Sequence, residues 1–175
     1  AAGGGKIYIF GLETDGSRIY AFDQGDMSLS FKTAVISGRQ IESPILYYDG
    51  YVYAGVYGGS KEKPAQFACF DATKDSDGEL APTWTYSETV YHNRGGYLWS
   101  GPTIVGDAIV FTNTNGYITS LNRKTGEMID TYLIPEDFQG GEQLTTTPYY
   151  YEKNQRLYVS TAGTYGGILG IKMNT

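Results

Sequence analysis

Residues 43–55 read SPILYYDGYVYAG, and the same order of features returns at 101–112 (GPTIVGDAIVFT) and at 147–159 (TPYYYEKNQRLYV). Each segment has a proline at its second position, passes a polar turn and continues into a run rich in aliphatic and aromatic residues. Asp49-Gly50 between two such runs is a strong signal for a β-hairpin, and Gly106-Asp107 is a weaker one. An internal repeat of antiparallel strands therefore decides the fold.

Further runs extend each copy of the repeat toward four strands. Third runs are expected at 67–71, 117–122 and 167–172, and fourth runs at 83–86 and 128–132. The N-terminus is an incomplete copy, with runs at 6–10, 18–23 and 27–31. Four short antiparallel strands in roughly 40 to 50 residues are typical of a β-propeller blade.

The sequence thus predicts an all-β chain, a β-propeller of four-stranded antiparallel blades. The approximate blades are 1–38, 39–90, 91–140 and 141–175. The first lacks most of its opening strand and the last lacks its closing strand. About four blades make either a partial propeller or half of an eight-bladed ring.

Composition excludes several functional classes. The 175 residues include 13 basic and 19 acidic side chains, a formal net charge of −6, which argues against a phosphate-binding nucleic-acid protein. The single cysteine, Cys69, cannot form an internal disulfide or supply a Cys-rich zinc or iron–sulfur site. No run approaches the roughly 20 apolar residues of a membrane span.

Several of these segments resemble PQQ-like repeats, those of the quinoprotein alcohol dehydrogenase-like superfamily. The resemblance rests on Ser43-Pro44, on 49–53 and Phe70-Asp71, and on 101–127 with its Lys124-Thr125-Gly126-Glu127 turn. It covers nearly the whole chain and implies a propeller that has seven or eight blades when complete. Trp84 corresponds to a tryptophan that the family often places on the outer strand, where it docks neighbouring blades.

The resemblance implies two kinds of chemistry within the superfamily. Its enzymes hold pyrroloquinoline quinone against a tryptophan, with Ca²⁺, an adjacent Cys–Cys disulfide and an aspartate base. Its other members use the propeller as a scaffold for protein contacts. Cys69 is alone, and no matching set of Trp, Glu, Asn and Asp is found, so PQQ is not expected and no cofactor is predicted.

A loop between the second and third blades carries the candidate ligand-binding residues His92, Arg94, Tyr97 and Trp99. Aromatic rings, an arginine and the Gly95-Gly96 pair on the open face of a propeller suit contact with a sugar or a peptide. His92 is the only imidazole, and no nucleophile elbow is visible. No catalytic residue is therefore predicted. An exposed loop between blades is the favoured interpretation, and ligand contact is the alternative.

An acidic segment offers a candidate Ca²⁺ site at Asp71, Asp75, Asp77 and Glu79. Calcium prefers several oxygen ligands, and Asp-x-Asp-Gly resembles the centre of a calcium loop. Thr73 replaces the first acidic ligand and no bidentate glutamate closes the loop, so the full signature fails. Asp-Ser-Asp-Gly is also a good turn sequence, and a solvated turn is the favoured interpretation.

Other aromatic and small residues are expected to pack. Cys69 aligns with Ala21 at a small position of the third strand and is interpreted as a buried thiol. Tyr8, Tyr20 and Tyr53 fall within strands, whereas the 149–151 cluster lies at a strand end and suits a contact surface.

Four blades with truncated ends leave two apolar faces to be covered. The expected partners are further blades in a longer chain or a second fragment, or a second copy that closes an eight-bladed ring (4 + 4). The function predicted is a non-catalytic module that binds a protein or another ligand in an extracytoplasmic bacterial protein, whether secreted, at the cell surface or periplasmic. A fragment of a PQQ-dependent dehydrogenase and a carbohydrate-binding propeller are the alternatives.

Overall fold

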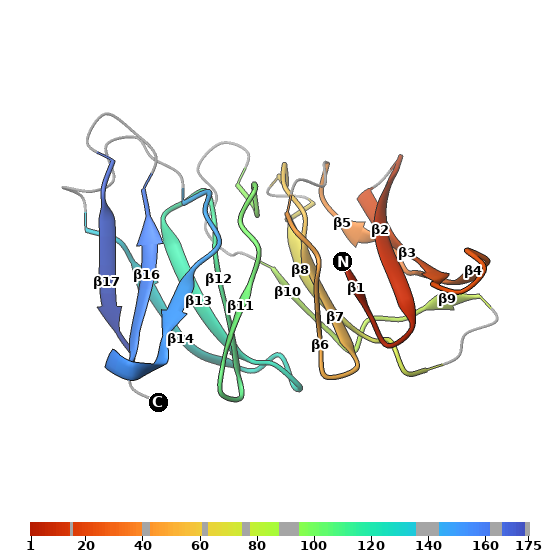
Figure 1. The fold of residues 1–175 in the computed structure, drawn as a ribbon. Helices are drawn as coiled ribbons and strands as arrows, with labels where there is room; N and C mark the ends of the chain where they lie inside the picture. The colour runs from red at the N-terminus through yellow and green to blue at the C-terminus, as the bar shows by residue number, and fades with distance from the viewer. Residues whose placement is uncertain are drawn as a thin grey trace.

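The computed structural model describes residues 1–14, 16–39, 43–60, 63–74, 78–87, 95–135, 144–161 and 166–173. Its strands form four sheets that stand side by side (Figure 1). The described residues include no α-helix and one short 3-10 helix, η1 (Glu152–Asn154). The predicted all-β class and the series of four repeated sheets are confirmed.

We call the sheets blades 1 to 4 in chain order. Blade 1 contains β1 (Ala2–Gly3), β2 (Lys6–Glu13), β3 (Gly16–Asp23) and β4 (Leu29–Thr33), with β5 (Ile36–Ser37) and β9 (Glu79–Leu80) at its margins. Blade 2 contains β6 (Leu46–Tyr48), β7 (Tyr51–Gly55), β8 (Gln66–Asp71) and β10 (Trp84–Ser87). Blade 3 contains β11 (Thr103–Val105), β12 (Ala108–Thr112), β13 (Tyr117–Asn122) and β14 (Met128–Leu133). Blade 4 has three described strands, β15 (Tyr149–Tyr151), β16 (Arg156–Ser160) and β17 (Ile168–Lys172).

The Asp49-Gly50 turn joins β6 to β7 as the sequence predicts. Asp49 has φ 52° and Gly50 has φ 81°, so both central residues are in the left-handed region. A two-residue turn of this kind has a twist that matches the flanking strands, and Asp-Gly is among the pairs that adopt it at least cost. The local sequence therefore sets the register of this hairpin.

The four blades share one register, which makes their positions comparable. The second and third strands of successive blades pair at Tyr8 with Ala21, Tyr53 with Cys69, Val110 with Ser120, and Tyr158 with Gly170. The turn after each third strand repeats one backbone hydrogen bond, from the amides of Gln24, Ala72, Arg123 and Met173 to Gly5, Gly50, Asp107 and Gln155. In the first three blades, each second-strand residue of these pairs is buried against the next blade. We call that face of a blade its forward face and the opposite one its backward face.

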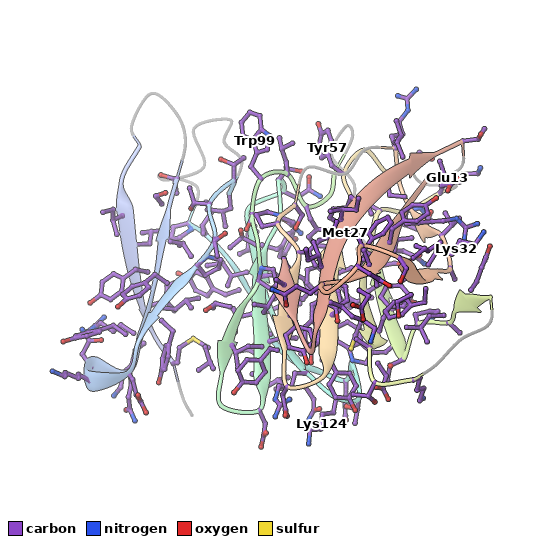
Figure 2. All side chains as sticks on the ribbon, turned by 45° about the vertical axis from the view of Figure 1, so that its right-hand side comes forward. Glu13, Met27, Lys32, Tyr57, Trp99 and Lys124 are labelled. Atoms are coloured by element: carbon purple, nitrogen blue, oxygen red, sulfur yellow. The ribbon has the colours of Figure 1, made fainter. Side chains whose placement is uncertain are left out.

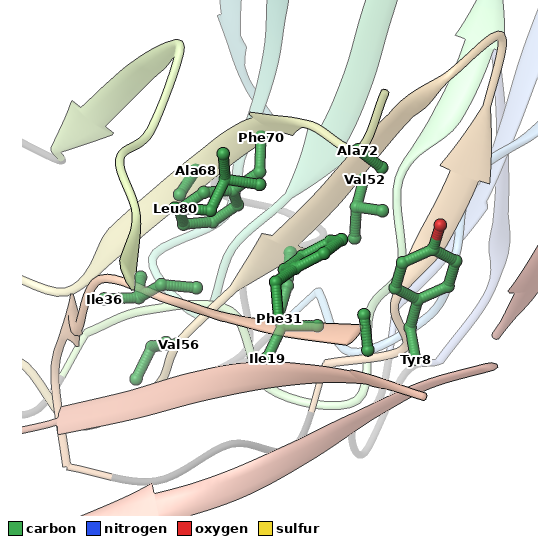
Figure 3. Packing of buried hydrophobic residues seen from close by; sticks show 12 residues of the cluster. Tyr8, Ile19, Phe31, Ile36, Val52, Val56, Ala68, Phe70, Ala72 and Leu80 are labelled. Atoms are coloured by element: carbon green, nitrogen blue, oxygen red, sulfur yellow. The ribbon is translucent and has the colours of Figure 1, made fainter. Parts of the chain in front are cut away.

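Apolar contact between successive blades builds the core. Between blades 1 and 2, Tyr8, Ile19 and Phe31 pack on Val52 and Phe70 (Figure 3). Between blades 2 and 3, the rings of Phe67 and Phe111 stack with centroids 4.1 Å apart. Alternate residues of each strand point to opposite faces, so each interior blade contributes to two cores.

The backbone carbonyl of Arg123 ties blade 2 to blade 3. It accepts hydrogen bonds from Tyr53 Oη at 3.2 Å and Trp84 Nε1 at 3.1 Å, and Cys69 Sγ lies 4.0 Å away. The Arg123 side chain reaches back across the junction to Asp49 Oδ2 at 3.1 Å. One residue of the turn thus supplies polar partners for three buried groups of the preceding blade.

Trp84 docks on the same turn of the next blade. Gly126 has φ 74°, and a β-carbon there would lie 2.6 Å from Trp84 Cγ. Glycine is required at this position for two reasons. An L-residue is strained at this φ, and the indole fills the space that a β-carbon would occupy. The expected role of Trp84 in joining neighbouring blades is confirmed.

Replacing Gly126 with alanine should destabilise the fold more than the same change at Gly5. Both residues have φ 74°, but nothing lies within 4 Å of a β-carbon at Gly5. Gly5→Ala should cost roughly 1–2 kcal/mol of backbone strain. Gly126→Ala should add about 1–3 kcal/mol from overpacking against Trp84. Urea unfolding of the two variants measures the difference, and equal costs would contradict the docking of Trp84 on Gly126.

Burial of Cys69 predicts a loss of stability at high pH. Burial raises the pKa of its thiol to about 12, and burial, followed by the nearby Tyr47, raises the pKa of Tyr8 to about 12. The unfolded chain ionises these groups first, so their contribution is complete below the ordinary pKa of 9.0 for the thiol and is lost as pH rises toward 12. The free energy of unfolding should fall over that range, and less steeply in Cys69→Ala. A flat profile in the wild type would contradict the burial of these groups.

Candidate functional site

The loop that leads into blade 3 holds the described part of the predicted ligand-binding group. Tyr97 and Trp99 are described, whereas His92 and Arg94 lie outside the described residues. Tyr97 is fully buried, with its ring edge-on to Phe67 and Phe111 at centroid distances of 5.3 and 5.4 Å. Its ring is thus part of the core between blades 2 and 3.

Trp99 has the opposite environment. Its side chain is 63% exposed, although Leu98 and Ser100 on either side of it are buried. Figure 2 shows it beyond the strands at the same end of the molecule as Tyr57, whereas Lys124 lies at the opposite end. The backbone of Trp99 has φ 56°, a conformation that costs a residue with a β-carbon roughly 1–2 kcal/mol. The chain therefore turns outward at this residue and presents an indole to solvent.

Buried hydroxyl groups hold this turn in place. Ser100 Oγ donates to the carbonyl of Thr146 at 3.0 Å and lies 2.5 Å from Thr112 Oγ1. Ser43 Oγ donates to the carbonyl of Ser100 at 2.9 Å, and the Gly101 amide donates to Thr147 Oγ1 at 2.9 Å. These bonds connect the segments that open blades 2, 3 and 4.

Sequence reasoning did not identify these hydroxyl groups as a set. A signal was present, because Ser43-Pro44, Ser100-Gly101-Pro102 and Thr146-Thr147-Pro148 each place a hydroxyl residue one or two positions before the proline. Strand prediction rests on the alternation of apolar residues, so it does not single out short polar side chains at the start of a strand. Their structural effect is to fix the backbone on which Trp99 stands.

The described acidic residues of the predicted Ca²⁺ site have different partners. Asp71 Oδ1 accepts from Thr73 Oγ1 at 2.6 Å and from the Thr73 amide at 3.1 Å, and Lys74 Nζ lies 3.7 Å from Oδ2. The hydrogen bond from the Thr73 hydroxyl is the main cause that lowers the Asp71 pKa. Asp71 ends β8, and its carboxylate organises the turn that follows.

Glu79 instead lies at the margin of blade 1. It belongs to β9, which pairs in parallel with β4, and its Oε1 lies 2.7 Å from Arg18 Nη1. That contact lowers the pKa of Glu79. Arg18 Nε also lies 3.1 Å from Glu13 Oε1, so one guanidinium serves two carboxylates.

Asp75 and Asp77 lie outside the described residues, and the Ca²⁺ site stays a prediction. Among the residues that are described, no three His, Cys, Asp or Glu side chains gather closely enough to hold a metal ion. No helix in the described part of the chain is long and apolar enough to cross a membrane.

These sheets and their packing define a series of β-propeller blades. Among solved structures, BamB from Moraxella catarrhalis matches 98% of this chain with a TM-score of 0.63 and 16% identity, over 48% of its own length. A europium-containing methanol dehydrogenase matches 98% with a TM-score of 0.69 and 13% identity, over 38% of its length. The quinohemoprotein alcohol dehydrogenase from Comamonas testosteroni matches 90% with a TM-score of 0.62 and 16% identity, over 28%.

The likeness establishes the fold, and the chain spans about half or less of each of these structures. No protein-family model matches the sequence, and no curated protein matches it either. The predicted resemblance to propellers of the quinoprotein type is thus confirmed at the level of the fold.

Trp99→Gly tests whether the indole has a structural purpose. Glycine accepts φ 56° without strain, and the exposed ring contributes little to the core. The free energy of unfolding should stay unchanged or rise by up to about 1 kcal/mol. Tyr97→Ala is the contrasting variant and should cost about 3–5 kcal/mol, because it removes a fully buried ring. Equal destabilisation by the two changes would show that Trp99 stabilises the fold.

Proposed function

We propose that this chain is a non-catalytic propeller module that binds a protein or another ligand through the end of the blades that carries Trp99. The supporting observation is the exposed indole on a left-handed residue between two buried neighbours. Backbone strain of this kind persists where the surrounding structure enforces it, and it concentrates at functional sites. A large aromatic ring presented on a rigid base is well suited to recognition.

The proposal places the module in an extracytoplasmic bacterial protein. Low charge content and abundant Tyr and Gly support this location, as does the resemblance to PQQ-like propellers. Loops at the end of a rigid propeller can change sequence without altering the blades, which suits a scaffold for binding.

Binding by Trp99 can be measured on arrays of oligosaccharides and of overlapping peptides. We expect the wild-type chain to bind a subset of one array, and Trp99→Gly to weaken that binding at least about tenfold. Tyr132→Ala is the matched control, since Tyr132 is also exposed but lies on β14, and its binding should stay within about twofold of wild type. Full binding by Trp99→Gly would contradict the proposed role of the indole.

The second candidate function is a fragment of a quinone-dependent dehydrogenase, favoured by the fold it shares with a quinohemoprotein alcohol dehydrogenase. Neither Trp84 nor Cys69 supports a quinone site. Trp84 lies beneath the Gly126 turn and cannot stack on a cofactor, and Cys69 is a buried, unpaired thiol. Dye-linked alcohol oxidation by the purified chain with PQQ and Ca²⁺, or a quinone spectrum that survives dialysis, would overturn the non-catalytic proposal.

A further inference from the structure

We infer that the forward face of blade 4 and the backward face of blade 1 form an interface with a second copy of this chain. Blade 4 of each copy packs on blade 1 of the other. These two faces are at the ends of the series of sheets, and no other described blade covers them (Figure 1). The inference is independent of what Trp99 binds.

The forward face of blade 4 carries an interface residue that has no blade to pack on. The shared register makes Ile168 equivalent to Ile19, Phe67 and Ile118 in the other three blades. Those three side chains are 0%, 0% and 6% exposed because the next blade covers them, whereas Ile168 is 75% exposed. The position is apolar in every blade, and only in blade 4 does it face solvent.

The backward face of blade 1 shows the same contrast. Ile9 is equivalent to Ala54, Phe111 and Val159, which are 0%, 1% and 2% exposed. Ile9 itself is 49% exposed. Tyr20 lies opposite Ile9 on the neighbouring strand, and Ile7 opposite Phe22. Blade 1 therefore presents an apolar surface at the place where every later blade contacts its predecessor.

Charged turns at the rim of the two faces are complementary. In the interior, Arg123 in the turn after the third strand of blade 3 pairs with Asp49 in the first turn of blade 2. The corresponding turn of blade 1 carries the exposed carboxylate of Asp26, whereas Asp23 ends β3 on the forward face of that blade. The corresponding part of blade 4 carries three exposed basic residues and one exposed acidic residue: Lys153, Arg156, Lys172 and Glu152. The polarity is reversed, and the net positive rim of blade 4 would face Asp26 of the second copy across the junction.

The tyrosine that donates a buried hydrogen bond from blade 2 to blade 3 has an equivalent residue on blade 4. Tyr158 is equivalent to Tyr53, whose hydroxyl donates to the Arg123 carbonyl of the next blade. Asn154 Nδ2 donates to the Tyr158 hydroxyl at 2.8 Å, which leaves that hydroxyl's own hydrogen to donate. The residue of blade 1 equivalent to Arg123 is Gln24, so its carbonyl on the second copy is the acceptor that we assign.

A second copy is the occupant that we assign to both faces. The chain matches 98% of its own length to 48% of BamB, so two copies span about the length of that one propeller chain. A two-fold axis would create two identical junctions, each between blade 4 of one copy and blade 1 of the other, and would close the ring. Closure leaves neither apolar face exposed.

Sedimentation and light scattering of the 175-residue chain test the inference directly. We expect a species of about 38 kDa, twice the chain mass of 19.2 kDa. Its dissociation constant should rise with added salt. Ile9→Lys and Ile168→Lys should each raise the dissociation constant at least about tenfold, because each places a charge in an apolar contact. Met128→Lys, an exposed residue of β14, is the matched control and should remain a dimer.

Mixing the two variants separates loss of the interface from loss of the fold. A junction needs an intact blade 1 face on one copy and an intact blade 4 face on the other. Each variant alone lacks one of these faces throughout, whereas the mixture should recover one junction and give a heterodimer. A wild-type monomer at micromolar concentration would overturn the inference and assign both faces to blades of a longer polypeptide. Assemblies larger than a dimer would equally overturn the two-copy ring.

Discussion

Each blade has two faces, and the packing of one blade on the next is the contact on which the rest of the structure depends. A single four-stranded sheet exposes one or both apolar faces to water, so its stability comes from neighbouring sheets. Phe67 on Phe111 and Tyr8 with Phe31 on Phe70 show that this packing is made mainly by large side chains. The Arg123 carbonyl completes it by satisfying Tyr53 and Trp84, two buried donors that would otherwise cost free energy.

The same packing sets the position of the candidate binding residue. Tyr97 is held in the core between blades 2 and 3, and Ser100 is held by hydroxyl contacts to the opening segment of blade 4. Trp99 lies between these two anchors, so its backbone has little freedom to relax from the left-handed conformation. A rigid base for an exposed ring is thus a direct consequence of how the blades meet.

Local patterns predicted the hairpins and the buried Cys69, because each depends on neighbouring residues or on the repeat, whereas the docking of Trp84 was implied by the family resemblance. Two features were not predicted correctly from local patterns: the start of β4 and the partner of Glu79. The expected strand at 27–31 begins instead at Leu29, since Met27 closes the preceding turn with φ 61°. Glu79 was grouped with Asp71 because they are close in sequence, but β9 carries it to Arg18 of blade 1. Such cross-blade pairing depends on which sheets are adjacent, and strand periodicity does not contain that information.

The sequence by itself determined the all-β class and the repeat of antiparallel strands, because turn chemistry and alternation are properties of short segments. Tertiary structure alone decided which aromatic residues are available for contact. Tyr97 and Trp99 are two residues apart and chemically similar, yet one is fully buried and the other is exposed. The physical reason is that burial follows from the neighbouring blade on each side, and the chain turns outward between two residues that this packing holds in place.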